Sequence, residues 1–374
     1  MIVEVHADGE APGVKREWDE LADLTSAPPF LRAGWFEAFR RGFETDSPYV
    51  ITARDGGELI GIAPLTSTSS TLRSATNVHT PVFGFVAAGE DTVRALVEVA
   101  LSIHRPHVAI THLEPADPAA RALLELAPRA GYHVNFEWTL AAPYVLIEGT
   151  FEEYEARLRK KLLTELRRRR RRLDEMGDLR LDVADGSSDL DALLAEGYEV
   201  EGSGWKGKRG TSISSQRATR RFYAEIARWA AERGWLRLAF LRLNDKPIAF
   251  DYGLECCGTH YLLKTGYDES LARYAPGMIL RRFMLERAFS LGLNKYDFLG
   301  EDYSWKREFT GASGERVSLQ MYSGSVHGAA LRAKSAASKS IEKILRAAVE
   351  RAFGQRGVDA ARRARFALRQ FRDS

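Results

Sequence analysis

Cysteine is nearly absent from this chain, since only Cys256 and Cys257 occur among its 374 residues. Adjacent cysteines rarely meet the geometry of a disulfide bond. The chain also has no C-x-x-C pair and no cluster of cysteine and histidine residues with metal-ligand spacing. We therefore expect neither a disulfide-stapled scaffold nor a bound structural metal such as zinc.

Long apolar runs are missing as well. No stretch approaches the roughly 20 apolar residues needed to cross a bilayer, and the first residues lack the basic and apolar regions of a signal peptide. We expect a cytoplasmic protein, with peripheral contact at the inner face of a membrane kept as an open alternative. G-x-S-x-G, P-loop and metal-type histidine motifs are absent too, and this absence disfavours a hydrolase triad.

The net charge is close to zero, because 54 basic and 51 acidic residues give +3, so bulk charge predicts no nucleic-acid partner. Residues 328–374 differ from the rest, since they hold 12 basic and 4 acidic side chains. Their pattern predicts a basic amphipathic helical tail over 326–374. Such a helix can lie on an anionic membrane surface. A helix packed on its own domain or on a second copy of the chain is the alternative.

Apolar periodicity and turn residues predict an α/β protein with two units. The first has expected strands at 49–54, 59–65, 107–113, 132–138 and 142–147, and expected helices at 31–43, 92–103 and 119–130. The second has expected strands at 235–243, 248–254, 261–265, 295–299 and 317–322, and an expected helix at 278–291. We expect domains at 1–148 and 149–325, followed by the tail. Hairpins around Asp55 and Asp245 indicate a weak internal repeat or a chance match.

A long helix over 151–176 is expected between the units, and it contains six consecutive arginines, Arg167 to Arg172. Successive helical residues are rotated by about 100°, so the six surround the helix and leave much of it exposed. Three ligands suit such a run: the phosphates of coenzyme A, tRNA, or anionic lipid headgroups. Arginine outnumbers lysine throughout the chain, so composition alone also explains the run.

Two glycine-containing segments are candidates for ligand binding. Tyr274-Ala-Pro276-Gly277 precedes a predicted helix that begins at Met278; glycine lets a ligand approach closely, and free amides at a helix N-terminus favour a phosphate. An ordinary loop with proline at a helix entrance is the alternative. The segment from Glu201 to Gly210 surrounds Trp205 and Lys206 with glycines. It is predicted to be a loop of the kind that lines active sites, and an exposed linker explains it equally well.

Ionisable residues on expected strands are further candidates. Asp251 lies opposite its apolar neighbours, so it must be paired, solvated or functional. A desolvated carboxylate suits a general base for an amine, and a salt bridge to Lys264 is the structural alternative. Asp297-Phe-Leu-Gly300 ends a strand in a glycine turn and delivers Tyr303 and Lys306 to the sheet end where ligands of α/β proteins bind.

Roles can be suggested for the last segment from side-chain chemistry. Tyr303 is suited to protonating a thiolate leaving group, and Lys306 to holding a phosphate or carboxylate. Packing of Tyr303 and Trp305 on the sheet is the alternative. His260 begins a strand without a serine or aspartate partner pattern, and we predict a structural role for it.

Five segments together resemble a known family. They are Glu201-Gly-Ser-Gly-Trp205-Lys206-Gly, Pro247-Ile-Ala, Thr265-Gly-Tyr267-Asp-Glu269, Tyr274-Ala-Pro-Gly277, and Asp297-Phe-Leu-Gly300 with Tyr303 and Lys306. Their order and spacing resemble the BioF2-like, or CelD-like, acetyltransferases of the GNAT superfamily, which are similar to the FemAB aminoacyl transferases. The resemblance is strongest over about 150–323, and the hairpin at Asp55–Leu65 fits a degenerate first copy more loosely.

The resemblance implies tandem GNAT-like α/β domains of mixed sheets and flanking helices, the second of them catalytic. It also implies acyl-CoA as a co-substrate, held in a splayed central sheet with its pyrophosphate at a helix N-terminus. By resemblance, Tyr274, Pro276, Gly277 and Met278 bind that co-substrate. The segment has one glycine where the commoner GNAT pattern has several, which leaves room for a longer acyl-CoA or an aminoacyl-tRNA.

The remaining site residues take roles around an acceptor. Glu201 becomes a candidate base, and Trp205, Lys206, Lys306 and Asp297 candidate substrate contacts. In the expected mechanism a neutral amine attacks the thioester, Glu201 or Asp251 receives its proton through water, backbone amides stabilise the oxyanion, and Tyr303 protonates the departing thiolate.

The sequence therefore predicts an acyl-CoA-dependent N-acyltransferase without a metal. The expected acceptor is an amine of a cell-envelope lipid or polysaccharide precursor, for example a ceramide-type amino lipid. A FemAB-like, tRNA-dependent aminoacyltransferase is the alternative enzyme, and nucleic acid is an expected partner only in that case. A third alternative is a non-catalytic scaffold of a membrane complex.

Overall fold

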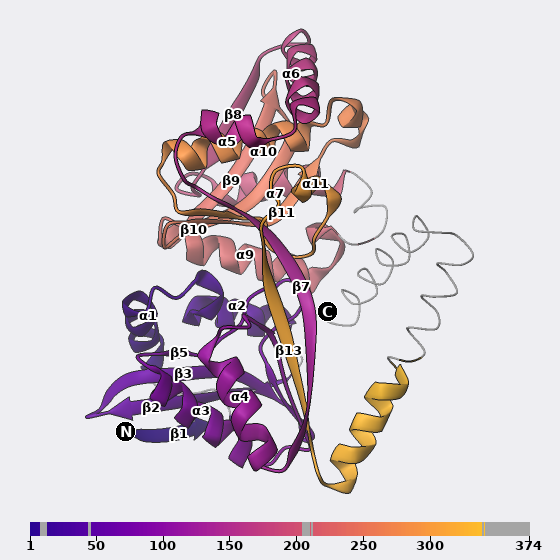
Figure 1. Ribbon diagram of the computed structural model, residues 1–374. Helices are drawn as coiled ribbons and strands as arrows, with labels where there is room; N and C mark the ends of the chain where they lie inside the picture. The colour runs from indigo at the N-terminus through magenta and orange to yellow at the C-terminus, as the bar shows by residue number, and fades with distance from the viewer. Residues whose placement is uncertain (8–12, 44–45, 204–209, 211, 339, 341–374) are drawn as a thin grey trace. The chain divides into compact units, whose positions relative to one another are not determined.

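A computed structural model describes residues 1–7, 13–43, 46–203, 210, 212–338 and 340. The chain divides into two compact units, each an α/β structure (Figure 1). The first unit comprises Met1–Arg40, Glu44–Thr139 and Glu315–Ser374, and the second comprises Arg41–Phe43 and Leu140–Gly314. The chain enters the second unit within β7 (Tyr132–Leu146) and leaves it within β13 (Ser313–Ser323).

The first unit is built on a mixed sheet with strand order β1-β2-β3-β4-β6-β13, with β5 paired to β3. Its strands are β1 (Ile2–His6), β2 (Ser47–Asp55), β3 (Glu58–Ser67), β4 (Thr71–Ser74), β5 (Val86–Ala87) and β6 (His107–Leu113). Its helices are α1 (Val14–Leu24), η1 (Pro29–Leu31), α2 (Ala33–Phe43), α3 (Glu90–Ser102) and α4 (Pro118–Arg129). Apolar residues from α3, α4 and the sheet form one core, which includes Leu96, Leu123 and Ile51.

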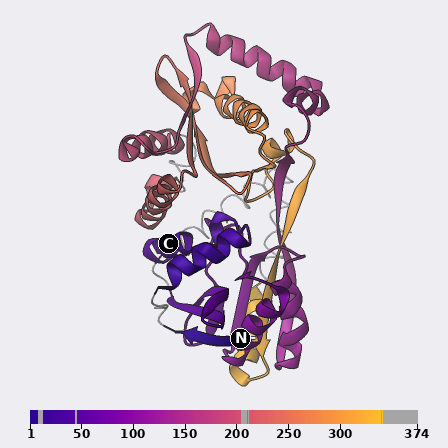
Figure 2. The same cartoon turned by 90° about the vertical axis from the view of Figure 1, so that its left-hand side faces the viewer.

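The second unit has strand order β7-β12-β11-β10-β9-β8. Its strands are β8 (Leu179–Ala184), β9 (Leu236–Leu243), β10 (Lys246–Cys256), β11 (Thr259–Tyr267) and β12 (Lys295–Asp297). Its helices are α5 (Phe151–Arg157), α6 (Lys160–Asp174), α7 (Leu190–Gly202), η2 (Ile213–Ser215), α9 (Arg217–Glu232), η3 (Glu269–Tyr274), α10 (Pro276–Ser290) and α11 (Ser304–Arg307). Figure 2 shows α7 and α9 on one face of this sheet and α10 on the other.

The alternation of side chains along β10 explains why helices cover both faces. Phe250 packs against Gly197 of α7, where a Cβ atom would lie 2.5 Å from its ring, and Tyr252 donates a hydrogen bond to Tyr223 O of α9 at 2.9 Å. Asp251, between them, points to the opposite face and contacts Arg281 of α10. Both faces of this strand are therefore buried.

Tight turns connect the two hairpins that the sequence predicts. The turn between β2 and β3 uses Gly56 and Gly57, and that between β9 and β10 uses Asn244 and Asp245; all four residues have positive φ angles. Positive φ at both central positions is the geometry of the two-residue turns that match the strand twist, and Gly, Asn and Asp are the residues that adopt it most readily. Both hairpins are therefore confirmed, with strand ends within a few residues of those expected.

Four expectations about individual elements are wrong. The strand expected at 317–322 in the second unit belongs to β13, and these residues pair with β6 of the first unit. The helix expected over 151–176 is broken into α5 and α6 at Leu158 and Arg159, which are extended; the break lets both helices bury apolar residues in the same core. The strands expected at 132–138 and 142–147 are one strand, β7. Glu201, expected in a loop, lies in the last turn of helix α7, which ends at Gly202.

Much of the basic tail lies outside the described residues. Positions 326–338 form a helix, while 339 and 341–374 are not described. Within the described part of the chain, no helix combines the length and apolar character that spanning a bilayer requires.

Candidate functional site

The sheet of the second unit opens between β11 and β12. These two parallel strands pair only at Thr259, His260 and Tyr261, opposite Lys295, Tyr296 and Asp297. β11 then continues to Tyr267, whereas β12 ends at Asp297. Diverging parallel strands leave backbone groups at their carboxyl ends available to a ligand. This opening is the place around which the predicted site residues are arranged.

The N-terminus of α10 follows the end of β11. Ala275 has a left-handed backbone with φ 49°, and Pro276 begins the helix. The end has no side-chain cap and no acidic residue in its first turn. A Cβ atom added at Gly277 would lie 3.4 Å from the Tyr267 ring. The absence of a side chain at Gly277 therefore leaves a narrow space between the helix and this ring. An uncapped N-terminus of a 15-residue helix suits a phosphate group.

Glu201 lies against the same end of β11. A Cβ atom at Gly266 would come within 2.4 Å of the Glu201 Cα, so only glycine permits this close packing of α7 on the strand. The Glu201 side chain is 1% exposed, and its carboxylate accepts a hydrogen bond from Ile213 N at 2.9 Å. Glu201 packs on Gly266, and Gly277 lies beside Tyr267; because successive residues of a strand face opposite sides, the two lie on the two faces of the sheet at the same end of β11.

The end of β12 holds a second polar cluster. Asp297 is buried, accepts a hydrogen bond from Leu299 N at 2.9 Å and lies 2.7 Å from Lys295 Nζ. Leu299 and Gly300 follow with φ angles of 50° and 54°. These left-handed residues turn the chain sharply and bring α11 back beneath the strand end.

Lys306 of α11 closes this turn. Its ammonium group donates hydrogen bonds to Leu299 O and, at 2.7 Å, to Glu301 O. The side chain is 4% exposed. Burial lowers the pKa of Lys306 to about 7, against the opposing effect of Asp297. Its nitrogen lies 5.3 Å from the centre of the Tyr303 ring and 5.7 Å from that of Trp305, so Lys306 and half-buried Tyr303 are neighbours.

Asp251 lies in a buried ion pair, and its partner is Arg281 of α10. Arg281 Nη2 donates to Asp251 Oδ1 at 2.7 Å, and Nη1 makes an ion-pair contact of 2.6 Å with Oδ2. Both side chains are 1% exposed. The guanidinium group also donates to the Tyr296 hydroxyl and to Thr265 Oγ1. The suggested partner Lys264 instead lies over the Tyr223 ring. The geometry favours the structural alternative for Asp251.

His260 belongs to another buried network. Its Nδ1 lies 3.1 Å from Glu255 Oε1, and its ring stacks on Tyr296 at 4.5 Å between centroids. Glu255 also contacts Arg237 and Arg287. Although burial raises the pKa of Glu255, hydrogen bonds from His260 and Arg287 lower it to about 2. This arrangement agrees with the structural role predicted for His260.

The structure thus places the predicted residues in three groups. Glu201 and the Tyr274–Met278 segment lie at the end of β11; Asp297, Tyr303 and Lys306 lie at the end of β12; and Asp251 lies in the buried pair beneath the sheet. Trp205 and Lys206 fall outside the described residues. Their assigned roles stay predictions.

Sequence reasoning missed Arg281. The signal was present, because Arg281 shares a helical stripe with buried Met284, Leu285 and Ala288, at spacings of three, four and seven residues. A cation within an apolar stripe requires a buried anion. The residue that supplies it, Asp251, lies 30 positions away and could not be identified from local pattern.

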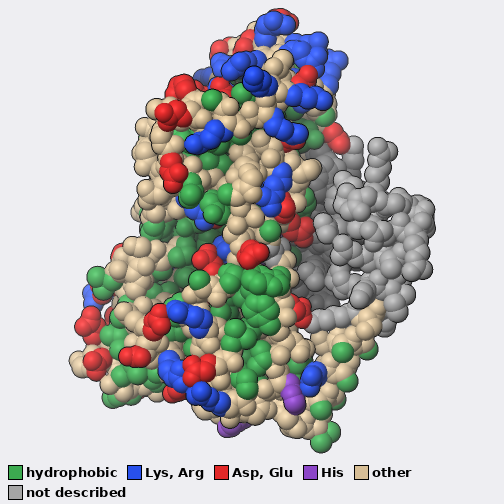
Figure 3. Space-filling view, in the orientation of Figure 1, with side chains coloured by type: hydrophobic (Ala, Val, Ile, Leu, Met, Phe, Trp, Pro, Cys, Tyr) green, Lys and Arg blue, Asp and Glu red, His purple; other side chains and the backbone are tan. Residues whose placement is uncertain are grey.

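The arginines of α6 differ in how far they are exposed. Leu166 and Leu173 are buried, and Arg170 stacks on Phe283 at 4.9 Å. Arg167 and Arg171, which project outward, are 70% and 73% exposed. At 100° per residue, Lys160, Lys161, Arg167, Arg168, Arg171 and Arg172 share an outward arc. Figure 3 shows Lys and Arg side chains gathered over this helix. We call this set the α6 basic face.

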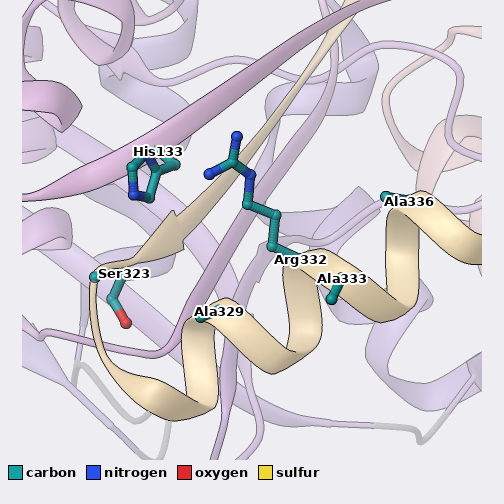
Figure 4. Close-up of a pocket in the computed structure, with 7 residues that line it drawn as sticks. His133, Ser323, Ala329, Arg332, Ala333 and Ala336 are labelled. Carbon is teal, nitrogen blue, oxygen red and sulfur yellow. The ribbon is translucent and has the colours of Figure 1, made fainter.

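A cavity of about 330 Å³ occurs in the first unit. Its lining comes from His133, the turn at Ser323 and Gly324, and the helix over 326–338, including Arg332 (Figure 4). None of the predicted site residues lines it. Among the described residues, no three His, Cys, Asp or Glu side chains lie close enough together to hold a metal ion.

Comparisons with known proteins identify a domain that the second unit resembles and the fold of the chain. Residues 160–307 match the family model of the acetyltransferase (GNAT) domain. Among solved structures, FemX is 13% identical, with a TM-score of 0.58 over 85% of this chain and 96% of that chain. The C-terminal domain (DUF2156) of a protein named as a lysylphosphatidylglycerol synthetase from Agrobacterium fabrum is 15% identical, with a TM-score of 0.55 over 85% of this chain and 94% of that one. A protein of unknown function from Bacteroides thetaiotaomicron gives 15% identity and a TM-score of 0.50 over 82% and 97%.

Identities this low show a shared fold and no more. A comparison with curated proteins gives no match. The structural similarity covers both units of the chain, and the family model lies within the second. Residues 160–307 therefore resemble the acetyltransferase (GNAT) domain, within a chain whose two α/β units share the fold of FemX.

Proposed function

We propose that the second unit transfers an acyl group from acyl-CoA to the amine of a cell-envelope lipid or polysaccharide precursor. The observation that carries the proposal is the juxtaposition at the end of β11. There the uncapped N-terminus of α10 and the buried carboxylate of Glu201 contact consecutive residues of one strand, Tyr267 and Gly266. An anion site on one face of the sheet and a proton acceptor on the other are thereby held at the same end of β11, next to the opening. These are the two groups that acyl transfer from a phosphate-bearing thioester to an amine requires.

The chain supplies a group for each step of this reaction. The α10 N-terminus and Gly277 would hold the pyrophosphate. Glu201 would receive the proton of the attacking amine through a water molecule, and Lys306 would donate a hydrogen bond to negative charge at the end of β12. Tyr303, beside Lys306, would return a proton to the departing thiolate. The carbon–sulfur bond breaks as the new amide bond forms, and the acceptor proton passes to Glu201.

The donor is tested by thermal denaturation in the presence of CoA, acetyl-CoA and palmitoyl-CoA, with detergent controls. A ligand that binds only the folded state raises the midpoint as its concentration passes its Kd. We expect stabilisation by all three, and a larger shift with palmitoyl-CoA if the acyl chain is long. Equal shifts with acetyl-CoA would favour a small acyl group. The absence of any shift would contradict the proposal and direct the search to aminoacyl-tRNA.

Replacing Glu201 with glutamine is expected to lower kcat about 100-fold. The amide oxygen still accepts a hydrogen bond from Ile213 N, so the melting temperature should change little, whereas the proton acceptor is lost. Transfer is followed as release of the CoA thiol. Glu199→Gln is the matched control, because Glu199 is exposed on the same helix. Equal rates in the two variants would exclude Glu201 as the base.

We further propose that the acceptor is reached at an anionic membrane surface contacted by the α6 basic face. Each Lys or Arg near an anionic bilayer contributes about 1 kcal/mol to binding, and six such residues share one arc of α6. The four outward arginines are chosen for the test because they can be removed without touching buried Leu166 and Leu173.

Glutamine replacement of Arg167, Arg168, Arg171 and Arg172 is expected to weaken binding to phosphatidylglycerol-containing vesicles at least about 100-fold. Sedimentation with vesicles at low and moderate salt measures this. The control carries four glutamines at exposed Arg16, Arg73, Arg121 and Arg129 of the first unit, which changes the net charge equally. If both variants bind equally weakly, only net charge matters. If both bind as the unaltered protein does, α6 has no role in membrane contact.

A further inference from the structure

The only two cysteines of the chain meet at a turn next to β12. Cys256 ends β10 and pairs with Thr259 of β11, so Cys257 and Gly258 alone form the connecting turn. Their φ angles are 53° and 71°. Two-residue turns of this type strongly prefer Asn, Asp or Gly at the first position. Cysteine has no side-chain oxygen to stabilise a left-handed backbone, so the turn itself does not explain why Cys257 is there.

The two sulfur atoms lie in contact. Cys256 Sγ and Cys257 Sγ are 3.0 Å apart. Cys256 is buried and Cys257 is exposed, so a dissolved reagent reaches one thiol and the other lies directly behind it. An exposed thiol with a second thiol within reach is the arrangement of a redox-active pair.

We propose that Cys256 and Cys257 are a redox-active dithiol that a small disulfide, such as oxidised glutathione, converts to a vicinal disulfide. The Cys257 thiolate attacks one glutathione sulfur, which forms a mixed disulfide and releases one glutathione thiolate. The Cys256 thiolate then attacks Cys257 Sγ and releases the second. Two electrons pass from the dithiol to the oxidant, and the two protons lost by the cysteines end on two molecules of reduced glutathione.

Such a bond is expected to be readily reversible. Adjacent Cα atoms are about 3.8 Å apart across a trans peptide, whereas disulfides usually join Cα atoms about 4.4–6.8 Å apart. A ring closed between neighbours is therefore strained, and strained disulfides are the easily reduced, regulatory ones. Adjacent cysteines rarely form a permanent structural disulfide, as expected from the sequence. The same strain makes a disulfide between Cys256 and Cys257 easy to reduce again, which is the property that reversible redox regulation requires.

The turn is coupled to the candidate site through β12. Gly258 O accepts hydrogen bonds from Asn294 N at 2.7 Å and Lys295 N at 3.3 Å. A Cβ atom at Gly258 would lie 2.4 Å from Asn294 Nδ2, so the two segments are closely packed. Closing the ring must twist the Cys256–Cys257 peptide and move the adjacent Gly258 carbonyl. Oxidation is therefore expected to loosen the start of a three-residue strand whose last residue is Asp297.

Intact-mass measurement after incubation with oxidised glutathione tests the chemistry and needs no activity assay. We expect the unaltered protein to lose two hydrogen atoms, to retain no glutathione and to remain a monomer on a non-reducing gel. Cys256→Ser should instead retain one glutathione on Cys257, because no second thiol displaces it. A stable glutathione adduct on the unaltered protein, a disulfide-linked dimer, or no reaction would each overturn the proposal.

Hydrogen exchange tests the coupling on the same samples. The amides of Asn294 and Lys295 should exchange about tenfold faster after oxidation and recover when the disulfide is reduced. Cys257→Ser treated with the same oxidant is the control and should show no change. If the vicinal disulfide forms while these amides are unaffected, the coupling to β12 is wrong. Failure of acyl-CoA to bind would leave both outcomes unchanged, so this inference stands apart from the proposed function.

Discussion

Replacement of Lys306 with methionine is expected to lower kcat about 100- to 1,000-fold, the usual effect of removing a donor to developing negative charge. The ammonium group has three N–H donors, and two of them are used by Leu299 O and Glu301 O. The nitrogen lies 5.3 Å from the centre of the Tyr303 ring and 5.7 Å from that of Trp305, within the cluster at the end of β12, and the third N–H is the one left for a ligand. Methionine fills the same volume but supplies no donor.

The pH dependence of kcat distinguishes two roles of Lys306, a cationic hydrogen-bond donor and a base. Because burial lowers its pKa to about 7, Lys306 is an ammonium below that pH and a neutral amine above it. The neutral amine keeps two N–H groups for the two carbonyls and presents a lone pair where the third N–H was. If Lys306 donates to negative charge, kcat falls as the pH rises above about 7. Because deprotonation of the acceptor amine also raises the rate, the profile is compared with that of Lys306→Met: a rise through pH 7 that this variant abolishes would identify Lys306 as a base and contradict this role.

Stability must change with pH in the opposite direction. The pKa of Lys306 in the folded protein, about 7, is below its ordinary value of 10.5. Between these values the unfolded chain binds more protons, so the contribution of Lys306 to the free energy of unfolding rises with pH. Lys306→Met should remove both the stability slope and the rate slope. Lys246→Met, at an exposed lysine bonded to Asp268, should remove neither.

Local chemistry made much of the fold predictable. One hairpin is predicted by Gly56 and Gly57, and the other is predicted by Asn244 and Asp245, because few other residues adopt those turns. The turn after β12 was also predictable, since Asp297-Phe-Leu-Gly300 ends an expected strand at a glycine, although the strand itself stops two residues earlier than expected. The segments at Glu201 and Gly277 were singled out by their glycines and given roles by the resemblance, and the structure adds that both lie against the end of β11, at Gly266 and Tyr267.

Features that depend on distant contacts were not predictable. The early end of β12 is not visible in Lys295–Leu299, which alternates like a longer strand; only its divergence from β11 reveals the opening. The break at Leu158 lets Phe151 of α5 and Leu173 of α6 enter the same core. The positions of these two side chains depend on the strands and helices around them, which the local sequence does not show. Lys264, suggested as an example of a partner for Asp251, lies opposite Tyr252 in the register, so its side chain is on the other face of the sheet, and Arg281 of α10 supplies the cation instead.

Replacing Arg281 with methionine is expected to reduce the free energy of unfolding by about 3–5 kcal/mol, because the buried Asp251 carboxylate then lacks its counter-charge. Asp251→Leu should cost a similar amount, since it leaves a buried guanidinium group. Replacing both residues removes both charges, so the double variant should be at least about 2 kcal/mol more stable than the sum of the single effects predicts. Urea unfolding of the four proteins measures this difference.

The exposed ion pair between Arg180 and Asp245 provides the matched control. Its atoms are 2.5 Å apart, but the two side chains are 52% and 85% exposed. The same cycle there should give a coupling of about 0–1 kcal/mol, because water screens both charges. Equal coupling energies at the two sites would show that burial does not strengthen the Asp251–Arg281 pair.

The double variant also decides between the two roles of Asp251. If the carboxylate only balances Arg281, the folded double variant should keep a kcat within about tenfold of the unaltered protein, because Glu201 still accepts the proton. If Asp251 is the base, kcat should fall about 100-fold even though stability is largely restored. The single variants cannot make this distinction, since each combines the loss of a charge with the loss of stability. Restoring stability without restoring the carboxylate therefore isolates the chemical role of Asp251.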